Sequence, residues 1–242
     1  MAVYITGIGI ISAIGLTVEE NFSSLKNLRT GIETVKYLES NKKFPAGEVK
    51  LSNEELIKKL NLKTNTISRT SLLGIVAAKE AWGNNLHDAT IRTGLIAASS
   101  VGGMDRTEKY FAQTHEGKNA DVALVSTHDI GNTTEKIATE LGFTGYINTL
   151  STACSSSANS IMLGARMIEQ NKLDRVLVGG SDALAMFTIN GFNSLMIYDN
   201  EWCKPFDENR NGLNLGEGAA FLVLESEACI SKTKNNFYCT LA

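Results

Sequence analysis

One cysteine stands out by its surroundings. Cys154 lies in INTLSTACSSSANS, residues 147–160, between an apolar stretch and a run with helical spacing. The small residues around it leave room for a substrate or a backbone to approach the thiol. At the start of a helix, unpaired N–H groups and the helix dipole favour a thiolate, which is the nucleophilic form of cysteine. The segment therefore indicates a nucleophile for acyl transfer, with backbone N–H groups as donors to the oxyanion.

A cysteine that performs acyl transfer usually needs a histidine or an equivalent acid or base. The sequence contains His87, His115 and His128, and none of them follows a convincing strand near Cys154. We interpret each as a surface or helix histidine. The ordinary alternative for Cys154 is a small, buried, apolar side chain at the start of a helix.

Two polar segments carry weaker signals. GGSD, residues 179–182, follows an apolar run, and we expect Asp182 to cap the element that comes next. FDENRNGLNLGEG is rich in turn-forming and charged residues. We expect its Asp207, Arg210 and Glu217 to form a buried ion pair or an interface contact with a scaffold role.

The glycine-rich segment SSVGGM, residues 99–104, lacks the Lys-Ser/Thr ending of a phosphate-binding loop and the full dinucleotide fingerprint. A nucleotide site is therefore not expected. The glycines are better suited to letting a substrate or another backbone come close.

The composition is that of an ordinary globular protein. The 242 residues are 43% hydrophobic and 20% charged, and the formal net charge of -3 gives no general attraction to nucleic acid or anionic membrane. The apolar N-terminus lacks a basic region, and no uninterrupted apolar run is long enough for a membrane span. We expect a cytoplasmic protein whose four cysteines are free thiols, with no metal and no cofactor.

Alternating patterns predict an α/β fold. Strand-like segments occur at 3–10, 93–100, 145–152, 174–182 and 216–225. Helical spacing appears at 17–28, 53–60, 71–82, 104–141, from residue 154 onward and in a short stretch at 190–198. The first of these segments also has a capping box at Thr17 and Glu20 and an apolar stripe. Strands that alternate with helices favour a largely parallel sheet, with a βαβ unit around Cys154.

Three segments, taken in order, are similar to a known family. STACSSSANSIMLGARMIE, DRVLVGGSDA and KPFDENRNGLNLGEGAAFLVLE resemble the β-ketoacyl-acyl carrier protein synthases, condensing enzymes of the thiolase superfamily, and the synthase I/II type most closely. The resemblance runs from VYITGIGIIS to the end of the chain. It implies a thiolase-like N-terminal half over residues 1–242, with a mostly parallel five-stranded sheet and helices on its faces. Residues 236–242 resemble the first strand of the C-terminal half, which is absent.

The resemblance also implies an activity. Cys154 would take an acyl group from acyl carrier protein, and a malonyl thioester would be decarboxylated and condensed with it, in fatty acid or polyketide-type synthesis. Val101 and Phe192 match positions that line the acyl pocket. The family's catalytic histidines and lysine belong to the second half, so these 242 residues alone are expected to be inactive. A homodimer or a condensing-enzyme heterodimer would form along GYINTLST.

Two alternatives stay open at this point. One is a non-catalytic, chain-length-factor-like partner subunit, although such relatives commonly lose the cysteine. The other is a cysteine hydrolase, but TACSS lacks the glycines of a nucleophile elbow. Asn211 and Leu213 depart from the aspartate and the aromatic residue that many relatives carry, so a specialised synthase competes with a housekeeping one.

Overall fold

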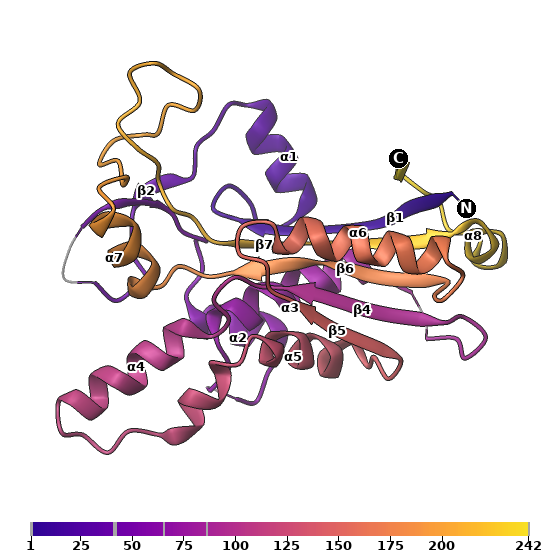
Figure 1. Cartoon of the computed structure of the whole chain (residues 1–242), viewed down its shortest axis with the longest axis horizontal. Helices are drawn as coiled ribbons and strands as arrows, with labels where there is room; N and C mark the ends of the chain where they lie inside the picture. Colours follow the sequence, from indigo (N-terminus) through magenta and orange to yellow (C-terminus); the bar gives the residue numbers. More distant parts are fainter. Residues whose placement is uncertain (1, 41–42, 65, 86, 242) are drawn as a thin grey trace.

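The computed structural model describes residues 2–40, 43–64, 66–85 and 87–241. A six-stranded sheet in the order β5-β4-β6-β7-β1-β8 carries helices on its faces (Figure 1), and a separate two-stranded sheet pairs β2 with β3. The main strands are β1 (Val3–Ser12), β4 (Thr93–Ala98), β5 (Tyr146–Leu150), β6 (Arg175–Asp182), β7 (Gly218–Ser226) and β8 (Cys239–Leu241). The small sheet consists of β2 (Ile32–Thr34) and β3 (Pro45–Gly47).

The helices largely follow the predicted segments. They are α1 (Val18–Lys26), α2 (Asn53–Leu60), α3 (Arg69–Trp82), α4 (Met104–His115), the 3-10 helix η1 (Val122–Thr127), α5 (Gly131–Leu141), α6 (Ser156–Glu169), α7 (Met186–Ser194) and α8 (Glu227–Thr233). Helix α5 ends at Gly142, whose φ of 71° is the left-handed conformation expected of a C-terminal glycine. Within the described ranges, no helix is long and apolar enough to cross a lipid bilayer.

The sheet corrects the expectation of a mostly parallel, five-stranded arrangement. Strand β4 pairs in parallel with β5 and β6, but β7 is antiparallel to both β6 and β1, and β8 is antiparallel to β1. The reason is the path of the chain after β6. Asp182 ends β6 directly opposite Gly218, which begins β7, so the intervening excursion returns to the same end of the sheet and the chain reverses direction.

Helix α3 is the central buried helix and packs on β1 and β7. Its Leu72, Leu73 and Ile75 are fully buried, and each such side chain contributes about 2 kcal/mol through burial. Gly7 and Gly9 of β1 face this helix. A Cβ atom at Gly9 would lie 2.0 Å from the carbonyl oxygen of Ala77, so only glycine permits this close contact between strand and helix.

Helix α6 covers the opposite face of the sheet (Figure 1). Its Ala165 and Ile168 pack in one apolar cluster with Val176 and Val178 of β6 and Leu224 of β7. This packing fixes the helix that follows Cys154 against the strand that lies beside β4.

Helix α1 forms as predicted, but its apolar stripe faces outward. The exposed fractions of Phe22, Leu25 and Leu28 are 68%, 64% and 94%. The side chains that turn inward are Asn21 and Ser24, because they hydrogen-bond backbone carbonyls in the turn between β1 and α1.

The capping box at the start of α1 is half formed. The hydroxyl of Thr17 accepts a hydrogen bond from the N–H of Glu20 at 3.2 Å, as expected. The Glu20 carboxylate accepts instead from the N–H of Leu16, at 2.6 Å. Both bonds satisfy N–H groups around the first turn, so the helix start is stabilised although the reciprocal partner differs.

Candidate active site

Cys154 lies at the predicted junction of strand and helix. Strand β5 ends at Leu150 and helix α6 begins at Ser156, so the cysteine occupies the turn between them. Its thiol is exposed, which excludes the alternative of a buried apolar side chain. Ser155, the residue before α6, makes no side-chain capping bond, so its hydroxyl does not occupy the N–H groups of the first turn. A negative charge at this place is favoured by those N–H groups.

The residue before the cysteine has an unusual backbone conformation. Ala153 has a φ of 53°, a left-handed value that costs a residue with a side chain about 1 kcal/mol or more. Its carbonyl oxygen accepts three hydrogen bonds: from the N–H of Ser156 at 3.0 Å, from the hydroxyl of Ser156 at 2.6 Å and from the hydroxyl of Ser100 at 3.2 Å. These bonds hold the peptide unit that enters Cys154 in place.

Asp182 was expected to cap the element that follows it, but this expectation is wrong: helix α7 has no local side-chain cap. One of its oxygens, Oδ1, accepts hydrogen bonds from the hydroxyl of Ser99 at 2.8 Å, the N–H of Ser100 at 2.8 Å and the N–H of Val101 at 3.3 Å. The parallel pairing of β4 with β6 explains this arrangement, because their carboxyl ends meet at one edge of the sheet. Asp182 therefore organises the turn after β4.

The glycines of that turn allow a close approach of backbone, one of the two roles expected for them. A Cβ atom at Gly103 would lie 2.3 Å from the carbonyl oxygen of Thr127 in η1. Gly102 has a φ of 58°, which also favours glycine. The turn thus packs against η1 on one side and reaches the Cys154 loop through Ser100 on the other.

The two predicted pocket residues lie on different elements. Val101 is next to Ser100, so the turn after β4 brings it to the Cys154 junction. Phe192 is half-buried on α7, a helix that contacts α4. The structure therefore places Val101 near the cysteine loop and Phe192 on a helix that contacts α4.

The start of α7 is bound by a carboxylate from α4. Glu108 accepts hydrogen bonds from the N–H of Met186, at 3.1 Å, and from the N–H of Phe187. Ala185 precedes the helix and offers no capping side chain, so Glu108 takes the place of a local cap. Burial raises the pKa of the Glu108 carboxyl, although the two N–H groups act in the opposite direction.

Glu217 is buried, but its partner is not the one expected from the sequence. Its carboxylate pairs with Arg69 at 2.6 Å and accepts hydrogen bonds from the N–H groups of Val49 and Leu184. Burial by itself would lower the pKa of Arg69. The hydrogen bond to Glu217 and the negative charge of its carboxylate act in the opposite direction, and the net effect is a raised pKa. Arg69 joins the start of α3 to the start of β7 and to the chain after β3.

The expected buried ion pair among Asp207, Arg210 and Glu217 is therefore wrong, while a contact of this segment at an interface stays a prediction. Asp207 and Arg210 are exposed, and the arginine donates to the backbone carbonyl of Asp207 at 2.9 Å. In the sequence, Arg69 is a single arginine before an apolar run with helical spacing. No local sequence pattern connects it to Glu217, so its role as the partner could not be predicted.

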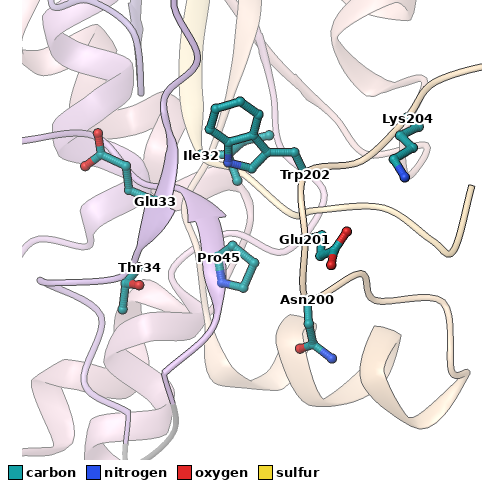
Figure 2. Close-up of a pocket in the computed structure, with 8 residues that line it drawn as sticks. All are labelled: Ile32, Glu33, Thr34, Pro45, Asn200, Glu201, Trp202 and Lys204. Atoms are coloured by element: carbon teal, nitrogen blue, oxygen red, sulfur yellow. The ribbon is translucent and has the colours of Figure 1, made fainter.

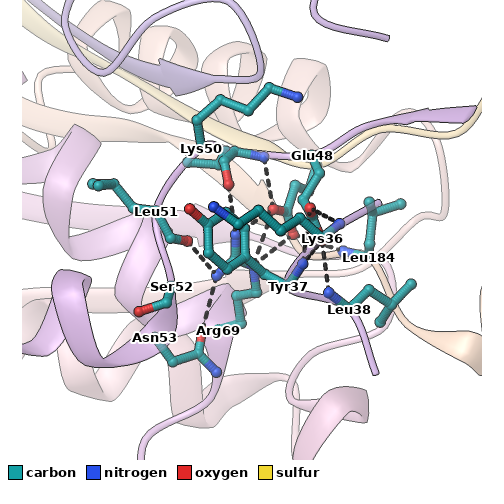
Figure 3. Close-up of polar contacts among 12 residues, drawn as sticks. Lys36, Tyr37, Leu38, Glu48, Lys50, Leu51, Ser52, Asn53, Arg69 and Leu184 are labelled. Carbon is teal, nitrogen blue, oxygen red and sulfur yellow. Dashed lines mark hydrogen bonds and ion pairs between the residues drawn. The ribbon is translucent and has the colours of Figure 1, made fainter. Parts of the chain in front are cut away.

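A second acidic side chain lies beside this ion pair. Glu48 accepts hydrogen bonds from three successive N–H groups, those of Lys36, Tyr37 and Leu38 (Figure 3). This carboxylate ties the segment between β2 and β3 to the body of the molecule.

Two cavities open near these elements. One of about 820 Å³ lies between α4, α7 and residues 36–39, and both Glu108 and Glu217 contribute to its wall. The other, of about 610 Å³, lies between the β2–β3 pair and residues 200–204, with Trp202 at its side (Figure 2). Cys154 lines neither of these two cavities; it lies in the exposed turn between β5 and α6.

The three histidines have partners elsewhere in the fold. His87 stacks on Trp82 and contacts the carbonyl of Leu141. His115 stacks on Phe111 of the same helix, and His128 contacts the hydroxyl of Thr107. None of these partners is a residue of the loop that contains Cys154.

Comparison with known proteins provides a second line of observation. Residues 1–228 match the family model described as the β-ketoacyl synthase, N-terminal domain. The chain is 29% identical over 251 residues to 3-oxoacyl-[acyl-carrier-protein] synthase 2 of Staphylococcus aureus (strain N315), which covers 98% of this chain and 60% of that protein. It is 28% identical over 232 residues to nodulation protein E of Rhizobium meliloti, with 93% and 57% covered. The chain thus spans about three fifths of the length of these relatives.

Solved structures show the same relationship. The ishigamide ketosynthase/chain length factor superposes with a TM-score of 0.90 at 25% identity, and the match covers 99% of this chain and 62% of that one. The ketosynthase ApeO in complex with its chain length factor ApeC, from Xenorhabdus doucetiae, gives a TM-score of 0.78 at 27% identity, with 93% and 58% covered. The mixed six-stranded sheet is therefore the arrangement found in the corresponding part of ketosynthase structures.

Proposed function

Because the chain belongs to the β-ketoacyl synthase family, we propose that Cys154 carries the acyl group in the decarboxylative condensation of a 3-oxoacyl-acyl carrier protein synthase. The observation that carries this proposal is the exposed thiol at the β5–α6 junction, preceded by a peptide unit that three hydrogen bonds hold in place. A nucleophile in such a turn is open to a thioester and lies beside N–H donors.

In the first step, the Cys154 thiolate attacks the carbonyl carbon of an acyl thioester on the carrier protein. A new C–S bond forms, and the carbonyl electrons move to oxygen as an oxyanion. The oxyanion then collapses and breaks the old C–S bond, so that the carrier leaves as a thiolate and takes up a proton. The backbone N–H of Cys154 is our candidate for a donor to that oxyanion.

In the second step, malonyl-acyl carrier protein loses CO₂, and the electron pair of the broken C–C bond forms an enolate. The enolate carbon attacks the acyl carbonyl on Cys154, a C–C bond forms, and the cysteine leaves as a thiolate. The product is two carbons longer than the acyl group. The acid and base groups for this step would come from the part of the relatives that this chain does not span.

Binding roles follow from the same proposal. Val101 and Phe192 are proposed to line the acyl pocket, which would be completed by segments outside this chain. The curated relative is named for an acyl-carrier-protein substrate, and acyl carrier protein is the partner proposed here. Strand β5 is an edge strand of the sheet, and we propose it as the contact between two subunits.

A chain-length-factor-like subunit is the second candidate. It is favoured by two solved relatives whose structures pair a ketosynthase with a chain length factor. The exposed Cys154 supports the first candidate, because a subunit that only sets chain length does not require a nucleophile there.

The test is acylation of the full-length protein by acyl-acyl carrier protein, read by mass spectrometry of the peptide that contains Cys154. We expect a covalent acyl group on Cys154, none in Cys154→Ala, and chain extension when malonyl-acyl carrier protein is added. Cys239→Ser is the matched control, since Cys239 is also exposed but lies in β8. A wild-type protein that stays unmodified and extends acyl chains only with a partner subunit would support the second candidate instead.

A further inference from the structure

The peptide unit between Ala153 and Cys154 is anchored by two separate parts of the fold. The Ala153 carbonyl accepts from Ser156, which begins α6, and from the hydroxyl of Ser100, in the turn after β4, at 3.2 Å. Ser156 alone would tie this carbonyl only to the helix that follows it. The bond from Ser100 adds a second anchor, from an element 53 positions earlier in the chain.

Anchoring the carbonyl also sets the direction of the Cys154 N–H. The peptide is trans, and in a trans peptide the C=O and the N–H point to opposite sides. With the carbonyl turned toward Ser100 and Ser156, the N–H of Cys154 is directed away from both. That N–H is the donor that an oxyanion on the acyl group would use.

Ser100 is itself held by a third element. Its N–H donates to Oδ1 of Asp182 at 2.8 Å, and the same oxygen binds Ser99 and Val101. Asp182 stands at the end of β6, whose pairing with β4 fixes its position. An ordered path thus runs from the Asp182 carboxylate through Ser100 to the carbonyl of Ala153.

We propose that Ser100 and Asp182 are positioning residues, which orient the backbone N–H of Cys154 toward the oxyanion of acyl transfer. This inference rests on the proposed function. Neither residue touches the acyl group in this scheme; they act through the Ala153 peptide. Loss of the Ser100 hydroxyl leaves the anchors from Ser156 in place, so the effect is smaller than the loss of an oxyanion donor, which is about 10²–10³-fold.

The test compares two reactions of the same sulfur in the full-length protein. Acylation by an acyl-carrier thioester passes through an oxyanion, whereas alkylation by iodoacetamide displaces iodide from carbon and forms none. We expect Ser100→Ala to slow acylation of Cys154 about tenfold while the alkylation rate between pH 6 and 9 stays at the wild-type value. Asp182→Ala should give a similar or larger loss. Asp182→Asn should recover part of it, because its amide oxygen can still accept from the turn.

The control is Ser126→Ala, which removes a serine hydroxyl that donates to the carbonyl of Ala123 in η1. It should acylate and alkylate like the wild type. Acylation of Ser100→Ala at the wild-type rate would overturn the inference and leave the proposed function standing. Equal losses of acylation and alkylation would also overturn it, since the residues would then place the sulfur rather than the N–H. Failure of the wild type to be acylated would overturn the proposed function, and the inference with it.

Discussion

The guanidinium of Arg69 and the carboxylate of Glu217 lie 2.6 Å apart in the interior, although 148 positions separate them in the sequence. The exposed fractions of their side chains are 8% and 0%. The pair joins the first turn of α3 to the residue before β7, so it connects the central helix with the strand that reverses the direction of the sheet.

Breaking this pair is expected to be costly. Glu217→Ala should lower the free energy of unfolding by about 3–5 kcal/mol, because it leaves the Arg69 charge buried without its partner. Urea unfolding of the protein measures the change. Arg69→Met combined with Glu217→Leu should be more stable than Glu217→Ala, since it does not leave the Arg69 charge buried without the partner that Glu217 provides. Lys50→Ala, which removes an exposed pair with Glu33, is the control and should change stability by less than about 1 kcal/mol.

The close contact between β1 and α3 predicts that a larger side chain at Gly9 will lower the stability of the protein. Gly9→Ala should destabilise the protein by about 1–3 kcal/mol or more, because its Cβ would meet the backbone of Ala77 at 2.0 Å. Gly191→Ala on α7 is the matched control, since no atom lies within 4 Å of its added Cβ. That change should leave stability equal or raise it by up to about 1 kcal/mol, as alanine favours helix. Thermal unfolding of the two variants separates these outcomes, and equal losses would count against the tight contact.

Glu108 should make stability depend on pH in a defined direction. Burial raises its pKa above the ordinary value of 4.5, so the folded protein holds this proton at pH values where the unfolded chain has released it. Stability should therefore fall as pH rises from 4.5 through the raised pKa, and no further above it.

The variant Glu108→Gln should make that fall less steep, as measured by urea unfolding at a series of pH values. Some slope should remain, because burial also raises the pKa of the neighbouring Asp105 carboxyl. An unchanged slope in Glu108→Gln would show that the carboxyl does not titrate in this way. Glu108→Ala should in addition lose about 1 kcal/mol, since the N–H groups at the start of α7 lose their acceptor.

The cysteines should differ sharply in reactivity. Cys229 is 2% exposed, and burial together with the hydrogen bond and charge of Glu225 raises its pKa to about 12. Iodoacetamide at pH 8 should therefore label Cys154 and leave Cys229 unmodified, with peptide mass spectrometry as the readout. In urea above the unfolding midpoint, Cys229 should be labelled as well. Early modification of Cys229 in the folded protein would contradict its burial beside Glu225.

Local patterns predicted most of the elements because the information for them is local. Helix α2 was expected at 53–60 and spans Asn53–Leu60, and the strand expected at 174–182 is β6. The Cys154 junction was found the same way, since an apolar run, a cluster of small residues and a helical repeat are adjacent in the sequence. The stripe of α1 shows the limit: its period is helical, but Phe22 and Leu25 face outward.

The sequence by itself thus determined the helices and strands, the position of the candidate nucleophile and, through several motifs, the family. Only the tertiary structure decided that β7 runs antiparallel, that Glu217 pairs with Arg69 and that Asp182 holds the turn containing Ser100. The physical reason is the distance along the sequence over which each kind of interaction acts. Periodicity and capping act between residues a few positions apart, whereas these partners meet only after packing has brought distant segments within hydrogen-bonding distance.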